Sequence, residues 1–169
     1  LSNSIRLDLV VNNLTCSAFT TKQVKLLSDG TSWRPLVHVE DMSNAFVLVL
    51  KSPTNKINGE TFNVGTNEEN YTVKEIAEKV EKIVPDSKIT YGENANKDAR
   101  SYRVDFDKIK NKLGFKTTWT LEKGIENIYE YLKKINLTEN EFNDKKYYRL
   151  KYIKWLIETN KLDSNLFAN

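Results

Sequence analysis

The 169-residue chain carries 26 Lys and Arg residues against 23 Asp and Glu, a formal net charge of +3, and 39% of its residues are hydrophobic. The length fits one domain with an extension, at roughly 100–200 residues per domain, and 11% aromatic residues argue against disorder. No run approaches about 18 uncharged apolar residues, which excludes a membrane span, and the small, mixed charge argues against a nucleic-acid partner.

The chain has one cysteine and one histidine, which limits the disulfides and metal sites that it can form. A single cysteine excludes an internal disulfide, and Cys16 with His38 cannot complete a four-ligand zinc site, so we expect no metal site. We interpret His38, which lies in an apolar strand, as structural, and Cys16, on an apolar helix, as a small buried hydrophobe. The first residues lack a basic segment followed by an apolar one, so we expect a cytoplasmic protein.

Apolar spacing and turn residues divide the first part of the chain. They predict helices over 7–19 and 42–50 and strands over 24–27, 34–39 and 61–64. Asp41 is the predicted N-cap of the second helix. That helix is apolar on nearly all sides, so we expect it to be buried.

The second part of the chain alternates helices with one more strand. A capping box at Thr72–Glu75 starts a helix that stops at Pro85, Asp105 and Thr120 are predicted N-caps, and Gly114 is a predicted helix end. The predicted elements are helices over 73–84, 107–113 and 121–135, a strand over 88–91 and a loop over 93–100. Because strands and helices interleave, the fold class is α/β or α+β.

The character of the sequence changes after residue 135. We divide the chain into a lobe over 1–135 and a helical C-terminal extension over 136–169. Residues 147–162 form an amphipathic helix that we expect to dock, or to mediate association, through aromatic side chains. The predicted contact face comprises Tyr148, Tyr152, Trp155, Leu156 and Thr159.

The usual motifs of dinucleotide chemistry are weak or absent. The six glycines are isolated, and no G-x-G-x-x-G or G-x-x-G-x-x-G run occurs, so this chain alone is not expected to hold a dinucleotide. Two Tyr-x-x-x-Lys spacings, Tyr129–Lys133 and Tyr147–Lys151, are interpreted as structural, because they lie on late amphipathic helices. The better polar candidates are Arg34, which suits phosphate oxygens, and the cluster over 98–103, whose alternative interpretation is a solvated loop.

The run from Asp29 to Asp41, DGTSWRPLVHVED, resembles the DG…R-x-aliphatic-x-HV-x-D segment of the extended short-chain dehydrogenase/reductases, the NAD(P)-dependent nucleotide-sugar epimerases and dehydratases. Four further matches follow in the family's order: GETFNVG at 59–65, YTVKEIA at 71–77, RSYRVD at 100–105 with Lys108 and LGF at 113–115, and TLEKGI at 120–125. The resemblance covers roughly residues 6 to 135.

This resemblance implies the C-terminal portion of an extended Rossmann-type epimerase or dehydratase. The expected fold is a small mixed α+β lobe, with the N-terminal dinucleotide-binding half and its catalytic Tyr-x-x-x-Lys absent from this chain. Residues 61–64 would be the last strand of the Rossmann sheet. The family implies NAD or NADP as cofactor, which we expect this chain alone not to bind, and no catalytic residue is assigned here.

The resemblance also implies substrate-binding residues. Arg34 occupies the position of the family's diphosphate-binding arginine, and Asp98 that of an acidic residue that meets the ribose in some epimerases. A second phosphate-binding arginine of those epimerases is replaced here by Ala95, and Arg100 or Arg103 would take its role.

The remaining implied contacts come from the first helix and strand. Asn12 and Asn13 lie on a helix that packs near the substrate in relatives. Leu26 and Leu27 belong to a stretch that runs along the nucleotide base.

Two functions follow as hypotheses. In the first, the chain is the substrate-recognising half of an epimerase or dehydratase that binds a nucleotide-diphosphate sugar, with a separate N-terminal Rossmann chain, the rest of one polypeptide, or a homo-oligomer as partner. In the second, it is a non-catalytic remnant or a protein-interaction module. Sugar, base and reaction type stay open.

Overall fold

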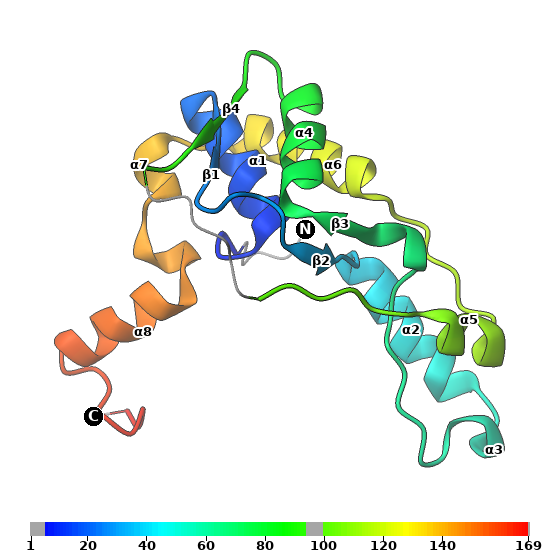
Figure 1. The fold of residues 1–169 in the computed structure, drawn as a ribbon. Helices are drawn as coiled ribbons and strands as arrows, with labels where there is room; N and C mark the ends of the chain where they lie inside the picture. The colour runs from blue at the N-terminus through cyan, green and yellow to red at the C-terminus, as the bar shows by residue number, and fades with distance from the viewer. Residues whose placement is uncertain (1–5, 94–99, 169) are drawn as a thin grey trace.

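The computed structural model of the protein describes residues 6–93 and 100–168 (Figure 1). Helices outnumber strands, and the strands are short. The helices are α1 (Val10–Thr21), α2 (Val39–Lys51), α3 (Thr54–Ile57), α4 (Val73–Ile83), α5 (Asp107–Leu113), α6 (Leu121–Ile135), α7 (Glu139–Phe142) and α8 (Arg149–Glu158), with 3₁₀ turns η1 (Asn67–Glu69) and η2 (Lys145–Tyr147). The strands are β1 (Gln23–Leu26), β2 (Trp33–Pro35), β3 (Asn70–Thr72) and β4 (Lys88–Tyr91).

The strands form two separate pairs. β1 pairs with β4 in parallel, with Val24 opposite Ile89, whereas β2 pairs with β3 antiparallel, with Arg34 opposite Tyr71. The main core lies where α1, β1, α4 and α6 meet. Its fully buried members include Val24, Ile76 and Ile125. The other elements of the lobe are arranged around this core.

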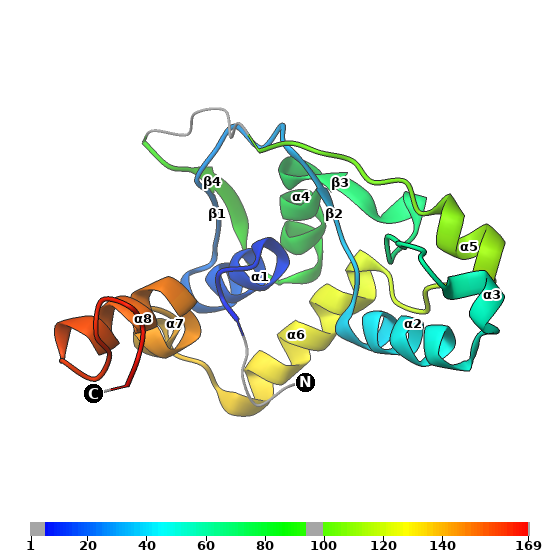
Figure 2. The same ribbon diagram turned by 90° about the horizontal axis from the view of Figure 1, so that it is seen from below.

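Two smaller clusters extend this core in opposite directions. One joins Leu7 and Cys16 to Leu132, Leu137 and Phe142, and so anchors the start of the C-terminal region on α1 and α6. The other joins Ala45 of α2 to Ile109 and Phe115, with Phe62 and Val64 packed against it. Figures 1 and 2 show the consequence: α8 extends on one side and the group of α2, α3 and α5 on the other.

Helix boundaries set by local chemistry agree with the sequence predictions. Thr72 and Glu75 form the reciprocal capping box of α4, Thr120 caps α6 by accepting the Lys123 N–H, and Gly114 ends α5 with a φ of +70°. The prediction of Asp105 as an N-cap was wrong: the N-cap of α5 is Phe106, although the Asp105 carboxylate, one residue earlier, accepts the Asp107 N–H at 2.9 Å. The strand predicted over 34–39 is shorter, since only Trp33–Pro35 pair with β3.

Three expectations for the α2 region were wrong. The N-cap of α2 is His38, whose ring accepts the Glu40 N–H, and Asp41 instead points its carboxylate at residues 118 and 119. Only Asp41 and Ala45 of α2 are buried, and Phe46 and Leu50 are 66% and 84% exposed. Residues 61–64 form no strand, because no described segment pairs with them.

Cys16 lies in the core, fully buried, and the resulting loss of hydration raises the pKa of its thiol to about 12. Because the thiolate is the reactive form, the native chain is expected to resist a thiol reagent such as Ellman's reagent at pH 8. The unfolded chain in urea should react fully with one equivalent, since Cys16 is the only cysteine. Rapid reaction of the native chain would contradict this packing.

Gly65 follows the unpaired segment and is closely covered by an aromatic ring. Its φ is +156°, and an added Cβ would lie 2.7 Å from the Phe106 ring. Gly65→Ala is therefore expected to lower the free energy of unfolding by about 1–3 kcal/mol through overpacking. Gly59→Ala is the comparison: nothing lies within 4 Å of the Cβ there, so its cost comes from its φ of +70° alone. Urea unfolding followed by circular dichroism measures both changes, and a smaller loss at Gly65 than at Gly59 would contradict the prediction.

The C-terminal extension folds into α7, η2 and α8, and α8 is shorter than the predicted 147–162 helix. Of the predicted contact face, Tyr148, Trp155 and Leu156 are half-buried, whereas no residue of α8 is fully buried. Within the described ranges, none of the helices is both long and apolar enough to cross a membrane.

Candidate functional site

A cleft of about 980 Å³ opens between the N-terminal turn, β1, the start of α2 and the start of α6. Five of the residues predicted from sequence lie on its walls in addition to Arg34: Asn12, Asn13, Leu26, Leu27 and Arg100. These positions span almost ninety residues of sequence, so the fold brings most of the candidate set to one place. Asp98 lies outside the described residues.

Arg34 stands on β2 at the wall of the cleft, half-buried. Its Nη1 donates to the Trp33 carbonyl at 2.7 Å and to the Arg100 carbonyl. The guanidinium therefore joins β2 to the segment that carries Arg100, and two cationic side chains line the same cleft. A guanidinium has five N–H donors in a planar fork, which suits phosphate oxygens.

The segment carrying Arg100 is held against β2 and β3 by specific hydrogen bonds. Trp33 N–H donates to the Ser101 hydroxyl at 3.0 Å, and Asn70 both donates to and accepts from the backbone of Val104 at 3.0 Å. Arg103, also a predicted site residue, is not among the cleft-lining residues. Its guanidinium lies 4.4 Å from the Trp33 ring centroid, a cation–π contact.

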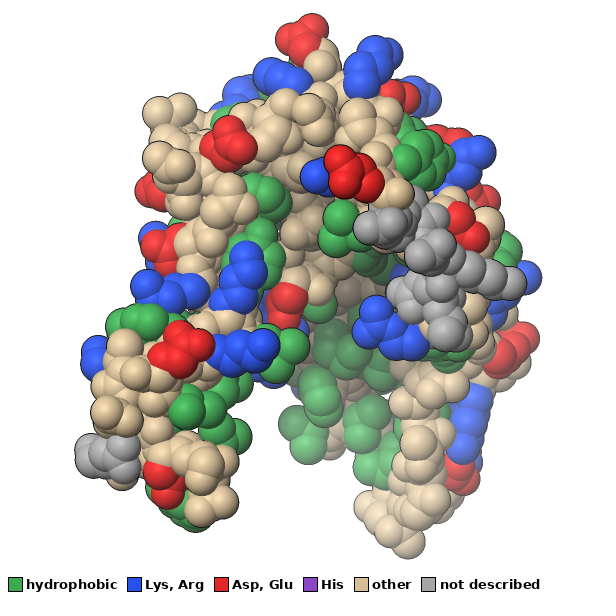
Figure 3. Space-filling model, turned by 60° about the vertical axis from the view of Figure 1, so that its left-hand side comes forward, with side chains coloured by type: hydrophobic (Ala, Val, Ile, Leu, Met, Phe, Trp, Pro, Cys, Tyr) green, Lys and Arg blue, Asp and Glu red, His purple; other side chains and the backbone are tan. Residues whose placement is uncertain are grey.

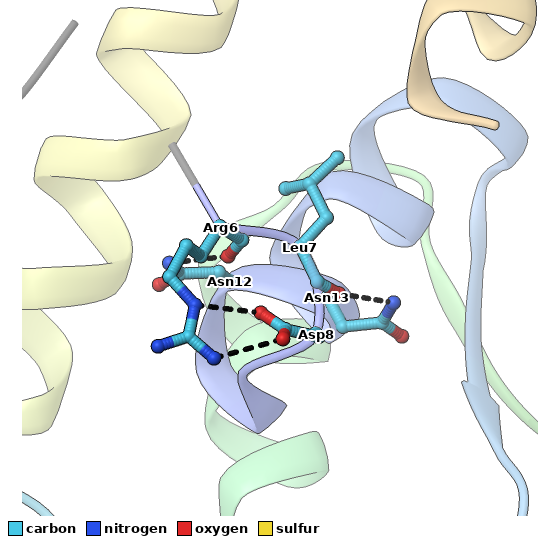
Figure 4. A network of polar contacts seen from close by, with 5 residues as sticks. All are labelled: Arg6, Leu7, Asp8, Asn12 and Asn13. Carbon is cyan, nitrogen blue, oxygen red and sulfur yellow. Dashed lines mark hydrogen bonds and ion pairs between the residues drawn. The ribbon is translucent and has the colours of Figure 1, made fainter. Parts of the chain in front are cut away.

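Asn12 and Asn13 fix the entry to α1, as Figure 4 shows. Asn12 Nδ2 donates to the Arg6 carbonyl at 2.8 Å, and Asn13 Nδ2 donates to the Leu7 carbonyl at 2.9 Å. Arg6 and Asp8 add a two-bond ion pair across the same turn, at 3.0 and 2.8 Å. The two amides therefore position this wall of the cleft, with their donors turned to the chain's own backbone.

Leu26 and Leu27 differ, although both line the cleft. Leu26 is almost fully buried in the main core, whereas Leu27 is 75% exposed. Alternation along β1 explains the difference, since successive side chains of a strand point to opposite faces. Leu27 thus offers the apolar surface at this edge of the cleft.

The far wall is built by a network that sequence reasoning missed. The carboxylate of Asp41, 1% exposed, accepts Thr118 N–H and Oγ1, both at 2.9 Å, and Trp119 N–H at 3.1 Å. This places the Trp119 ring on His38, with centroids 3.8 Å apart. Burial lowers the pKa of His38. The expectation of a structural histidine agrees with these contacts.

Glu69 closes the floor between β3 and α6. Its Oε2 accepts the Leu121 N–H at 3.0 Å, and its Oε1 accepts from the Tyr71 hydroxyl at 3.4 Å. Burial raises the pKa of this carboxyl. No local motif marked Glu69 or Trp119 in the sequence, because the Glu69–Leu121 and Trp119–Asp41 bonds join residues more than fifty positions apart.

The turn after β1 is not built like a dinucleotide-binding loop. β1 leads through Gly30 into β2 rather than into a helix, and a Cβ at Gly30 would lie 3.0 Å from the Lys74 side chain, so this turn is filled by the protein itself. The first N–H of α6 in the cleft is already bonded to Glu69. The start of α6 therefore does not offer the close, open backbone N–H groups that a pyrophosphate needs.

Comparisons of the sequence with known proteins agree on one family. Residues 5–65 match the NAD dependent epimerase/dehydratase family. The dTDP-glucose 4,6-dehydratase of Shigella flexneri is 32% identical over 133 residues, which is 73% of this chain and 36% of the relative.

Solved structures share the fold of this chain. The UDP-glucuronic acid 4-epimerase of Bacillus cereus, in complex with UDP-glucuronic acid and NAD, superposes with a TM-score of 0.64 at 24% identity, over 77% of this chain and 41% of that one. The dTDP-glucose 4,6-dehydratase of Bacillus anthracis, in complex with NAD, gives 0.61 at 20% identity, over 86% and 43%. The chain spans about two fifths of these proteins. It is thus related, in sequence and in fold, to the NAD dependent epimerase/dehydratase family.

Proposed function

We propose that the chain is the substrate-recognising part of an NAD(P)-dependent nucleotide-sugar epimerase or dehydratase and is not catalytic alone. The observation that carries this proposal is the cleft itself, which both Arg34 of β2 and Arg100 line. The family resemblance gives the position of Arg34 to a diphosphate-binding arginine, and Arg100 would replace a second one. Two guanidinium groups suit a diphosphate, and the apolar Leu27 at the cleft edge suits a base.

The role of this part is positioning. Arg34 and Arg100 would fix the diphosphate of the substrate, so that the attached sugar is held in one orientation. Restricting the freedom of a bound reactant lowers the barrier of a later step without any chemistry by the residues that hold it. NAD or NADP would supply hydride transfer when bound by residues outside those described here. The partner we propose is therefore a dinucleotide-binding half, in the same polypeptide or in a separate chain.

Isothermal titration calorimetry of the purified chain with UDP-, dTDP-, GDP- and CDP-sugars tests this function. We expect saturable binding of at least one nucleotide sugar, weakened by added salt because the contacts are ionic. NAD is expected to give no heat of binding, since the sequence has no glycine-rich dinucleotide-binding loop. Flat titrations with every nucleotide sugar would overturn the proposal and leave the non-catalytic remnant or interaction module.

A further inference from the structure

The C-terminal arm, which we define as residues 145–168, is strongly basic. It carries five lysines and one arginine against two acidic residues, a net charge of +4, whereas the rest of the chain has a net charge of −1. The arm begins after the last motif shared with the family, at residues 120–125. All of its cationic side chains are exposed: Lys145, Lys146, Arg149, Lys151, Lys154 and Lys161.

Helix α8 of the arm has an apolar stripe among these cations. Leu150 and Ile157 are seven residues apart and therefore lie on the same side of the helix. Leu150 is 74% exposed and Ile157 36%, and Lys154, four residues after Leu150, lies beside them. Figure 3 shows hydrophobic and cationic side chains next to one another on this side of the molecule, at lower left.

The turn after α8 exposes two further apolar side chains. The Asp163 carboxylate closes this turn, because it accepts the N–H groups of Asn165 and Phe167, both at 2.9 Å. Leu166 is 55% exposed and Phe167 71%. One of the two acidic groups of the arm is therefore bonded to the backbone of the turn that presents these side chains.

The lysines of the arm lie against its aromatic rings. The ammonium groups of Lys145 and Lys161, from before and after α8, lie 4.7 and 4.6 Å from the Trp155 ring centroid. That of Lys151 lies 4.1 Å from the Tyr148 ring centroid. These cation–π contacts hold cations in place along the arm, which lowers the entropy that is lost when they bind an anionic surface.

A lipid surface with anionic headgroups fits this combination best. A symmetric dimer through the arm would bring a net charge of +4 against +4, because both copies use the same surface. Protein interfaces are depleted of lysine, whereas five of the six cations here are lysines. A nucleic-acid backbone would take the lysines and leave the exposed apolar side chains without a partner. The boundary between headgroups and acyl chains takes both kinds of side chain.

We propose that the C-terminal arm binds the surface of membranes that contain anionic lipids. Leu150, Ile157 and Phe167 enter the headgroup layer, and the lysines contact lipid phosphates. The arm lies on the surface without crossing it, because α8 has 10 residues and a span needs about 20. The Leu7 N–H donates to the Tyr147 carbonyl at 3.0 Å, so the arm ties the lobe to the surface that it binds.

Co-sedimentation of the full chain with vesicles tests this proposal. Vesicles of equal parts phosphatidylcholine and phosphatidylglycerol are expected to bind the wild-type chain about tenfold or more tightly than vesicles of phosphatidylcholine alone. Added sodium chloride should weaken the binding, because the attraction is ionic. Lys146→Gln with Lys154→Gln, and Leu150→Ser with Phe167→Ser, should each lower the affinity for the anionic vesicles about tenfold.

Two pairs outside the arm are the matched controls for charge and for apolar area. Lys110→Gln with Lys116→Gln removes the same charge from exposed positions in another basic segment. Phe46→Ser with Leu50→Ser removes side chains that are 66% and 84% exposed on α2. Both control pairs should bind the vesicles like the wild type. Circular dichroism checks that the variants are folded, which is expected because every replaced side chain is exposed.

Absence of binding to both kinds of vesicle, equal binding to both, or equal losses in the arm pairs and their controls would overturn the proposal. Binding of DNA or of polyglutamate without binding of anionic vesicles would overturn it in favour of a nucleic acid or an acidic protein. A homodimer that the arm pairs abolish, again without vesicle binding, would assign the arm to self-association. The proposal does not depend on the proposed function, since vesicle binding requires no nucleotide sugar.

Discussion

Arg34→Ala is expected to weaken nucleotide-sugar binding by about 10- to 100-fold, the effect of losing one or two hydrogen bonds between charged groups. The guanidinium lies on the cleft wall and also joins β2 to the Arg100 segment through the Trp33 and Arg100 carbonyls. Its removal therefore takes away one cation and loosens the support of the second. Titration calorimetry with the best-binding nucleotide sugar measures the change.

Arg103→Ala is the matched control for this prediction. It removes the same charge three residues from Arg100, but its guanidinium lies on the Trp33 ring rather than along the cleft. Its binding is expected to stay within about twofold of the wild type, as for an exposed charge outside a binding contact. Arg34→Lys should be intermediate, because an ammonium keeps the charge without the planar fork. Equal losses of binding affinity for Arg34→Ala and Arg103→Ala would contradict the prediction, because they would show that Arg34 contributes only its positive charge.

The sequence predicted those features that depend on a few neighbouring residues. The capping box at Thr72, the cap at Thr120 and the glycine end of α5 at Gly114 are each decided within four positions of chain. The same holds for the periodicity of α4, whose apolar face, with Ile76, Ala77 and Val80, meets the main core. Arg34 and the cluster over 98–103 were candidates from their residue types, and the family resemblance assigned them to one substrate, but no local pattern would have brought Arg34 and Arg100 into one cleft.

The features that were not predicted depend on distant surfaces. The apolar sequence of α2 indicated a buried helix, yet its outer face meets no described part of the chain. Residues 61–64 alternate like a strand, but a strand needs a neighbour to pair with. In both places the pattern describes a burial that this chain does not itself provide.

Hydrogen bonds between side chains and residues far from them in the sequence were likewise not predicted. Asn12 and Asn13 were assigned to substrate, and their amide donors are turned to the Arg6 and Leu7 carbonyls. Asn70 holds Val104 from 34 positions away. A polar residue type shows which bonds are possible, whereas the tertiary fold decides which of them form.

Asp41→Ala is expected to be the most destabilising single change discussed here, with a loss of about 3 kcal/mol or more in the free energy of unfolding. The carboxylate is buried and accepts two backbone N–H groups and the Thr118 hydroxyl. Alanine leaves all three donors without their acceptor in a place that water does not reach freely. Asp41→Asn should cost less, since one carbonyl oxygen remains to accept. Urea unfolding followed by circular dichroism gives both values.

Glu40→Ala is the control, because Glu40 is the neighbouring acidic residue, is exposed, and accepts a single bond from Trp119 Nε1 at 2.8 Å. Its loss is expected to be about 1 kcal/mol or less. Equal effects at the two positions would show that the buried network contributes no more than a surface contact. The expected difference has a functional consequence, because the same bonds hold Trp119 against His38 on the cleft wall. Folded Asp41→Ala protein should therefore also bind nucleotide sugar more weakly than Glu40→Ala, although Asp41 itself points away from the ligand toward residues 118 and 119.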